Sequence, residues 1–167
     1  VCYYAGSPAL AVKPQADEVV KDMVHSRGQI KAEEPYKDGR RQGIARYYYE
    51  NGHLKSQQVY KNDLRDGLAQ YYYEDGILAV EEPYVNGGLE GQVRDYYPPG
   101  NIKGEIPYND NKIEGVARYY HENGRLELEQ TYKNGLREGL MRSYYPSGNL
   151  KSDCLYLYDK LEDNEKN

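Results

Sequence analysis

The amino-acid sequence predicts an all-β fold, an elongated antiparallel β-meander of about six β-hairpin repeats that are each 24 residues long. One observation is a column of glycines that recurs with this period, at Gly43, Gly67, Gly91, Gly115 and Gly139. Further columns keep the same period, among them Gly52 to Gly148, Leu54 to Leu150 and Tyr60 to Tyr156. Each unit also holds two runs of about seven aromatic or aliphatic residues bounded by turn residues, which is typical of β-hairpins. A fixed internal period of this length identifies a repeat protein.

The repeat array is predicted to span residues 19–158. Residues 1–18 carry two prolines and no periodicity, which indicates an N-terminal tail or linker. A weaker first unit follows, with Gly28, Ile30 and Tyr36 in register and Val19 at the position of the first glycine. With two strands per unit, we expect about 12 strands. Residues 159–167 are acidic and polar, and we interpret them as a C-terminal tail.

The first turn of each unit is expected to be a three-residue loop. Glu50-Asn51-Gly52 would suit either a two-residue type I′ turn or a type I turn followed by a left-handed glycine. The equivalent residues in a later unit are Pro98, Pro99 and Gly100. A type I′ turn would require a positive φ at Pro99, which the proline ring forbids. The three-residue loop is therefore the prediction.

The second turn carries only residues that tolerate the left-handed conformation, such as Asn62 and Asp63 or Asn86 and Gly87. We expect the same three-residue geometry here, so that even-numbered residues share one face of the sheet throughout the chain. That face, with Arg46, Tyr48 and Tyr60, would be the packed side. A register shifted by one residue is the alternative. It would form cross-strand charge pairs by placing Arg46, Arg94, Arg118 and Arg142 opposite Gln57, Glu105, Glu129 and Asp153.

Short turns place consecutive strands side by side, so the hairpins should form one wide sheet. A sheet of this width must twist or curl, and curling would enclose a groove along one face. The strands at the two ends leave open edges that could pair with another chain in a homodimer.

Composition excludes several functional classes. The net charge is −5, which disfavours binding to nucleic acid or to an anionic membrane surface. No run of about 18 apolar residues could span a membrane. The chain begins with Val, so a preceding signal peptide is compatible with it, Cys2 could be a lipid-attachment cysteine, and the compartment stays open. Two cysteines without a spacing pattern predict neither a disulfide framework nor a metal site.

The repeated unit resembles a known family. Its pattern is Gly-x4-Tyr-Tyr-x-x-Gly-x-Leu, followed by Tyr-x-Asn-Gly and the next glycine. This pattern resembles the MORN repeat, and more closely the bacterial MORN-repeat variant known as an antitoxin component of toxin–antitoxin systems. The resemblance covers about residues 19 to 156. It implies an elongated hairpin array that binds partner proteins, in some members through its groove, or membrane lipids in others. The sequence departs from the family pattern because it has no Phe or Trp at the aromatic columns.

No catalytic, cofactor or metal site is predicted. His25 and His121 occupy the same turn-flanking column four units apart, and His53 follows a turn, so the three histidines share no site. The serines have no positional partner for a nucleophilic triad. An acidic column is expected on the odd-numbered face as a solvated surface, with carbohydrate or cation binding as the alternative. Its members are Glu33, Glu81, Glu105, Glu129 and Asp153.

The candidate partner-binding residues are the arginines and tyrosines that recur beside each other on the even-numbered face. Arginines there could stack on the tyrosine rings, and both residue types are common in interface hot spots. The set comprises Arg46, Tyr48, Tyr72, Arg94, Tyr96, Arg118, Tyr120, Arg142 and Tyr144.

Two hypotheses follow. The first is a non-enzymatic repeat scaffold for protein-protein interaction, for which the family resemblance implies an antitoxin-like role. The alternative is a carbohydrate-binding module of the cell surface.

Overall fold

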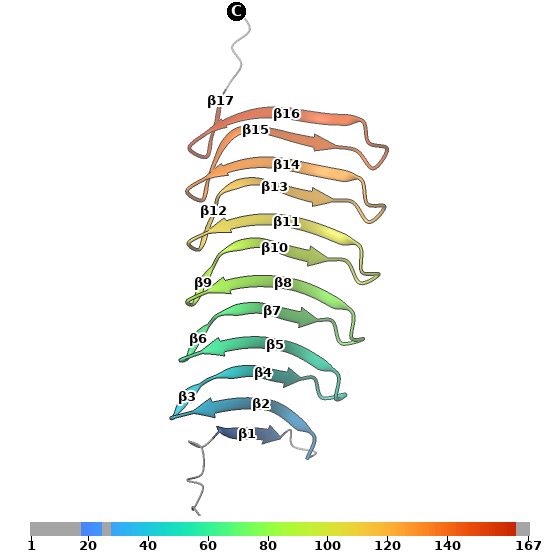
Figure 1. Cartoon of the computed structure of the whole chain (residues 1–167). Helices are drawn as coiled ribbons and strands as arrows, with labels where there is room; N and C mark the ends of the chain where they lie inside the picture. The colour runs from blue at the N-terminus through green and yellow to red at the C-terminus, as the bar shows by residue number, and fades with distance from the viewer. Residues whose placement is uncertain (1–17, 25–27, 163–167) are drawn as a thin grey trace, which may run out of the picture.

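The strands of this protein form one open antiparallel sheet. The computed structural model describes residues 18–24 and 28–162, in which 17 strands belong to a single sheet. Cys2 and His25, for which the sequence analysis made predictions, lie outside the described residues. Hairpins stack along a long axis, with one set of turns at each lateral edge of the sheet (Figure 1). The prediction of an all-β meander of hairpin repeats is confirmed.

Six hairpins account for the long strands. These strands are β1 (Glu18–Val24), β2 (Ile30–Lys37), β4 (Gly43–Tyr48), β5 (Leu54–Lys61), β7 (Gly67–Tyr72), β8 (Leu78–Val85), β10 (Gly91–Tyr96), β11 (Ile102–Asn109), β13 (Gly115–Tyr120), β14 (Leu126–Lys133), β15 (Leu136–Tyr144) and β16 (Leu150–Leu157). Short strands follow the second turns: β3 (Arg40–Arg41), β6 (Leu64–Arg65), β9 (Gly88–Leu89), β12 (Lys112–Ile113) and β17 (Lys160–Glu162). The strand β17 lies within the stretch that the sequence assigned to a polar tail.

Five strands are present beyond the expected 12. Four of them, β3, β6, β9 and β12, arise because a bulge interrupts the strand after the second turn, which does not happen in β15, and β17 is an additional short strand after the last second turn. In the second unit, Tyr60 pairs with Arg65, whereas Gln57 pairs with Gln70. Gln57 and Tyr60 are three positions apart on β5, whereas their partners Arg65 and Gln70 are five positions apart. The partner strand therefore holds two extra residues near Gly67, and the register shifts by two residues. A shift of two residues leaves every side chain on its original face.

The first turn has the three-residue geometry that the sequence predicts. Tyr49 N donates to His53 O at 2.9 Å, and Gly52 N donates to Tyr49 O at 3.0 Å. Gly52 has a φ of 88°, which is the left-handed conformation of the bulge glycine. The loop at Pro98 and Pro99 forms the same pair of hydrogen bonds. The three-residue loop predicted from Pro99 is therefore confirmed.

The second turn differs from the prediction. Lys61 pairs with Leu64, so only Asn62 and Asp63 form the loop, and both have positive φ values of 49° and 69°. This is a two-residue type I′ turn rather than a three-residue loop. Its backbone twist matches the right-handed twist of the flanking strands, which is why this type is favoured in tight hairpins.

The prediction that even-numbered residues share one face was wrong. Beyond the first turn, Tyr48 pairs with Leu54 but Tyr47 pairs with Ser56, so Lys55 is an extra residue in a β-bulge. The bulge shifts the register by one residue, which reverses the faces of all residues that follow on that strand. Each later unit repeats it, at Ala79, Lys103, Glu127 and Lys151. The shifted register, which the sequence argument rejected, is the one that the strands adopt.

One face of the sheet, here called the packed face, carries the core. Small residues lie under tyrosine rings there: Ala45 and Ala117 are 0% exposed, while the larger Tyr60 and Tyr84 are 7% and 8% exposed. Val93, Ile106 and Ala117 form a central apolar cluster against which Tyr119 and Tyr132 pack. No second layer covers the sheet in the described residues. The tyrosine rings themselves therefore shield the small core residues from water.

Hydrogen bonds along both edges join each unit to the next. At the first-turn edge, the hydroxyls of Tyr49, Tyr73 and Tyr97 donate to the main-chain oxygens of Tyr72, Tyr96 and Tyr120 at 2.7–2.8 Å. At the second-turn edge, Asp63 N donates to Arg41 O at 3.0 Å, and Gly87 N donates to Arg65 O at 2.7 Å. Each unit therefore depends on its neighbours, as expected for a repeat array.

A substitution at Gln130 is expected to stabilise the protein. Gln130 is 1% exposed, and its Oε1 has no hydrogen-bond partner, whereas its Nε2 donates to Thr131 O at 2.8 Å. Ile106 occupies the same position one unit earlier. Because an unsatisfied buried acceptor costs about 1–3 kcal/mol, Gln130→Ile should raise the free energy of unfolding in urea by about 1 kcal/mol.

The equivalent substitution Gln58→Ile provides a control with the opposite sign. The Oε1 atom of Gln58 accepts a hydrogen bond from the Tyr60 hydroxyl at 2.8 Å, so its loss leaves that hydroxyl without this partner. Gln58→Ile should therefore destabilise the protein. A lower urea midpoint for Gln130→Ile would contradict the prediction.

Alkaline pH is expected to destabilise the packed face. Partial burial and the neighbouring Glu82 raise the pKa of Tyr71 to about 12. Burial and a hydrogen bond to Glu82 also raise the pKa of Tyr84. Because these values exceed the unfolded pKa of about 10, the stabilisation is fully present below about pH 10 and is lost as the pH rises towards 12. The thermal midpoint of unfolding should therefore fall as the pH rises above about 10, and it should fall less steeply in the Tyr71→Phe variant. A midpoint that stays constant over this pH range would contradict the prediction.

Candidate functional site

The nine arginines and tyrosines that the sequence selected lie together on the sheet face opposite the core, here called the arginine face. Arg46 and Tyr48 alternate with Ala45 and Tyr47 along β4, so they point away from the packed face. The same alternation places the other seven on the arginine face of β7, β10, β13 and β15. The expectation that they share this face with Tyr60 was wrong, because the bulge at Lys55 turns Tyr60 to the packed face.

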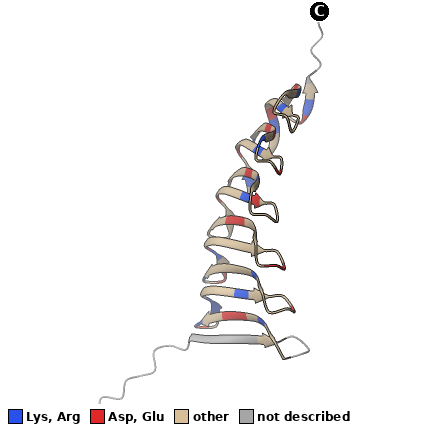
Figure 2. Cartoon of the chain, turned by 90° about the vertical axis from the view of Figure 1, so that its right-hand side faces the viewer, with Lys and Arg blue, Asp and Glu red and all other residues tan. Residues whose placement is uncertain are grey.

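A ladder of polar and charged side chains runs across the centre of the arginine face. Successive strand pairings place Glu33 beside Arg46, Arg46 beside Gln57, and Gln57 beside Gln70. The ladder continues through Glu81, Arg94, Glu105, Arg118, Glu129, Arg142 and Asp153. Apart from the neutral Gln57 and Gln70, positive and negative residues alternate along the stacked strands (Figure 2).

Ion pairs hold several of these arginines. Nitrogen–oxygen distances are 3.8 Å for Arg46 to Glu33, 3.7 Å for Arg94 to Glu105 and 3.3 Å for Arg142 to Glu129. The arginine side chains remain 43–46% exposed. At such exposure each pair contributes only about 0–1 kcal/mol to stability. A guanidinium group has five N–H donors, so these arginines also keep donors that can face a ligand.

The acidic column was expected on the opposite face, and that placement was wrong. Glu33, Glu81, Glu105, Glu129 and Asp153 belong to the same ladder as the arginines. The sequence did contain a signal for this, because the pairing of arginines with acids in three hairpins is favourable only in the shifted register. Pro99 restricts the backbone of the turn only, and the bulge lies outside the turn, at Lys103 in this unit.

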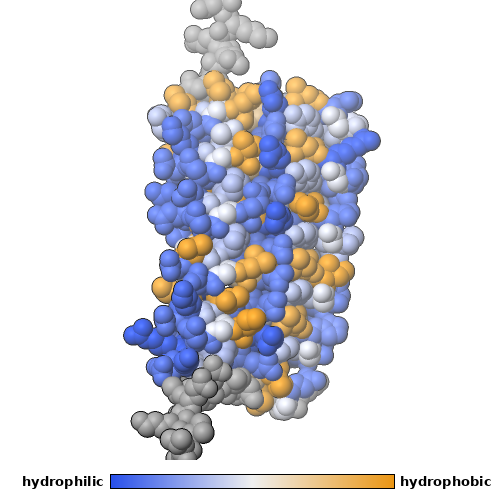
Figure 3. All heavy atoms as spheres, in the orientation of Figure 1, coloured by the Kyte–Doolittle hydropathy of each residue, from blue (hydrophilic) through white to orange (hydrophobic). Residues whose placement is uncertain are grey.

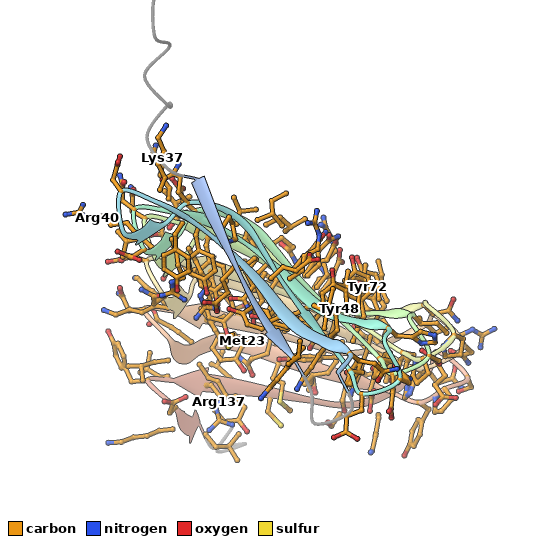
Figure 4. All side chains as sticks on the ribbon, turned by 90° about the horizontal axis from the view of Figure 1, so that it is seen from below. Met23, Lys37, Arg40, Tyr48, Tyr72 and Arg137 are labelled. Atoms are coloured by element: carbon orange, nitrogen blue, oxygen red, sulfur yellow. The ribbon has the colours of Figure 1, made fainter. Side chains whose placement is uncertain are left out.

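The tyrosines beside the ladder are held in place by its carboxylates. The hydroxyls of Tyr48, Tyr96 and Tyr120 each donate to the acidic residue of the preceding strand, at 2.9 Å in all three cases. Partial burial and then these hydrogen bonds raise the pKa of each tyrosine. Viewed along the long axis, Tyr48 and Tyr72 project to the same side of the sheet, at the end away from Lys37 and Arg40 (Figure 4).

Apolar residues flank the ladder on both sides. One column contains Ile44, Val59, Leu68, Val116, Leu140 and Leu155. The other contains Leu54, Leu78, Ile102, Leu126 and Leu150, which pair with the tyrosines. A hydrophilic column between two broken hydrophobic bands runs along the long axis in Figure 3, which is the pattern that this register predicts.

The expected continuous groove takes a more local form. One hollow opens at the first-turn edge, where Asn101 and Ile102 of one unit and Tyr120 and Asn123 of the next contribute to its lining. Two further hollows lie between second turns, around Asp38 and Asn62 and around Asp110 and Asn134.

Cation–ring contacts occur, but the observed examples lie away from the arginine column. The guanidinium groups of Arg41, Arg65 and Arg137 lie 4.2–4.3 Å from the ring centroids of Tyr60, Tyr84 and Tyr156. Lys55 and Lys103 lie over Tyr49 and Tyr97 at 5.6 and 5.7 Å. These contacts stabilise the second-turn edge and the first-turn edge, respectively.

The histidines that the structure describes take part in edge contacts. A ring nitrogen of His53 lies 2.7 Å from Glu74 O, and Nε2 of His121 lies 3.0 Å from Tyr144 O, where other units have a tyrosine hydroxyl. Within residues 18–24 and 28–162, no group of three or more His, Cys, Asp or Glu is arranged to hold a metal ion. The same residues contain no helix long and apolar enough to cross a membrane.

Comparison with known proteins identifies the repeat. A family described as "MORN repeat variant" matches residues 41–62, 65–86, 89–110, 113–134 and 137–158. The matched segments begin 24 residues apart, which agrees with the period of the glycine columns. A search of curated proteins found no match.

Proposed function

Since the chain belongs to the MORN repeat variant family, whose repeats generally act as scaffolds that bind proteins or membranes, we propose that this protein is a non-enzymatic scaffold that binds a protein partner along its arginine face. The family supports a scaffold rather than a catalyst.

The observation that carries this proposal is the repetition of half-exposed arginines beside oriented tyrosines in consecutive units. Arg and Tyr are enriched among residues that dominate binding energy at protein interfaces. Because the tyrosine rings are already held by Glu33, Glu81 and Glu105, little side-chain freedom would be lost on binding. On the packed face, the guanidinium groups of Arg41, Arg65 and Arg137 already stack on tyrosine rings, so they are less available to a partner.

Reversing two charges at the centre of the arginine face is expected to weaken partner capture without unfolding the protein. Arg94→Glu combined with Arg118→Glu places each new acid between two existing acids, so each substitution should destabilise the sheet by about 1–2 kcal/mol, while the core on the opposite face is unchanged. The affinity for the captured partner should fall at least about tenfold, equivalent to about 1.4 kcal/mol. The measurement is affinity capture from the native cells, followed by titration of the purified partner.

The matched control is Lys55→Glu combined with Lys103→Glu. These lysines lie over Tyr49 and Tyr97, away from the ladder, and the double substitution changes the net charge by the same amount. The control should retain the partner. Unchanged binding by the folded Arg94→Glu, Arg118→Glu variant would remove the arginine face from consideration.

An antitoxin-like role is the specific form of this proposal in which the bound protein is toxic alone. Co-expression of the wild-type chain with such a partner should then restore growth, whereas the variant with reversed charges should fail to do so. If growth recovered equally with both chains, the protective effect would not depend on the arginine face.

A further inference from the structure

The tyrosines of the arginine face recur along the array at nearly the pitch of a polyproline II helix. Each unit adds two strands about 4.8 Å apart, so equivalent side chains recur about every 9.6 Å. A polyproline II helix has three residues per turn and rises about 3.1 Å per residue, so its side chains recur about every 9.3 Å. We propose that the arginine face binds a proline-rich segment in this conformation, aligned with the long axis of the array. This proposal rests on the proposed function and names the partner's chemistry.

The aromatic column provides the apolar contacts that such a segment requires. Proline-rich segments bind in grooves lined by aromatic rings. Here the column contains one ring per unit, at Tyr48, Tyr72, Tyr96, Tyr120 and Tyr144. The hollow lined by Ile102 and Tyr120 lies between two consecutive units, where one proline ring of the segment could enter.

The ladder beside the tyrosines provides hydrogen-bond donors with the same spacing. The main chain of a polyproline II helix makes no internal hydrogen bonds, so its carbonyl groups need donors. Each unit offers one donor side chain, namely Arg46, Gln70, Arg94, Arg118 or Arg142. Arg46 and Arg94 contact carboxylates at 3.8 and 3.7 Å, and a guanidinium group has five N–H donors, so donors remain for a ligand.

Other peptide conformations match the array less well. In a β-strand, equivalent side chains recur every two residues, about 6.8 Å, and a residue three positions along points to the opposite face. In an α-helix, the nearest match is seven residues, about 10.5 Å. Over the four intervals between five units, the side chains of an α-helix would move out of register with the array by about 3.6 Å, whereas those of a polyproline II helix would do so by about 1.2 Å.

The test uses synthetic oligoprolines of about 6, 9, 12 and 15 residues, labelled with a fluorophore and titrated with the full chain by anisotropy. Affinity should increase with each added turn until about five turns cover the five tyrosines. Absence of binding by the longest oligoproline, or affinity that does not depend on length, would overturn the proposal. Stronger binding by a heptad-patterned helical peptide of equal span would also overturn it.

Variants locate the site. Tyr96→Ala with Tyr120→Ala should weaken binding of the longest oligoproline at least about tenfold, and Tyr145→Ala, which removes a ring outside the column, should leave it unchanged. If the double alanine variant fails to fold, Tyr96→Leu with Tyr120→Leu keeps apolar volume while removing the rings, and should show the same loss. Equal binding by the folded variants would refute the site.

Failure of this inference can be distinguished from failure of the proposed function. A partner that is lost on Arg94→Glu, Arg118→Glu substitution but is not displaced by the longest oligoproline would support the scaffold and refute the polyproline partner. A partner retained by that variant would refute both.

Discussion

Gly67→Ala is expected to lower the free energy of unfolding by about 3 kcal/mol. Gly67 has a φ of 133°, a conformation that side chains with a Cβ adopt only with strain of about 1–3 kcal/mol. An added Cβ would lie 3.0 Å from Cβ of Val59 and 3.2 and 3.3 Å from its two methyl groups. Because Cβ of Val59 is bonded directly to the main chain, it cannot move away without the backbone of β5, and overpacking should add about 1–3 kcal/mol. Urea unfolding measures the sum.

Gly76→Ala separates the two effects. Gly76 also has a positive φ, of 89°, but nothing lies within 4 Å of an added Cβ. This control should therefore lose only the strain component, about 1–2 kcal/mol. Adding Val59→Ala to Gly67→Ala should recover part of the loss. If Gly67→Ala and Gly76→Ala proved equally stable, the close approach at Val59 would have no energetic consequence.

Tyr84→Ala is expected to lower the free energy of unfolding by about 3–4 kcal/mol, in the range found when large buried rings are truncated. Tyr84 is 8% exposed, and its ring lies 4.2 Å below the Arg65 guanidinium. Its hydroxyl donates to Glu82 at 2.8 Å and accepts from Arg65 at 2.7 Å. Removal of the side chain would open the core between neighbouring hairpins and leave both charged groups without this partner.

Two further substitutions divide this effect. Tyr84→Phe keeps the ring but removes the hydroxyl, so it should cost only about 1 kcal/mol. Tyr145→Ala removes a ring that is 50% exposed and should cost less than about 1 kcal/mol. Since each unit contacts only its neighbours, amide exchange in Tyr84→Ala should accelerate in β5 to β10 and less in β14 to β16. Uniform acceleration over all strands would indicate that the array unfolds as one unit.

Part of the candidate site could be recognised before the fold was known. Arg46, Tyr48 and their repeats stood out because they recur two residues apart in nearly every unit, and two residues is the period of one strand face. Their acidic partners were misplaced because pairs across strands depend on register, and a single bulge changes the register of every later residue on the strand. The link between Tyr48 and Glu33 is a consequence of that register.

The sequence by itself determined the 24-residue period, the hairpin repeats and the first turn, because glycine, proline and tyrosine columns impose local backbone limits that need no tertiary context. Only the tertiary structure decided which residues share a face. The bulge positions, such as Lys55, Lys103 and Glu127, are exposed and accept many residue types, so they leave no local mark in the sequence. The faces were instead decided by packing, since Ala45 and Ala117 are buried beneath tyrosine rings only when the bulge turns Tyr60 and its repeats to their side.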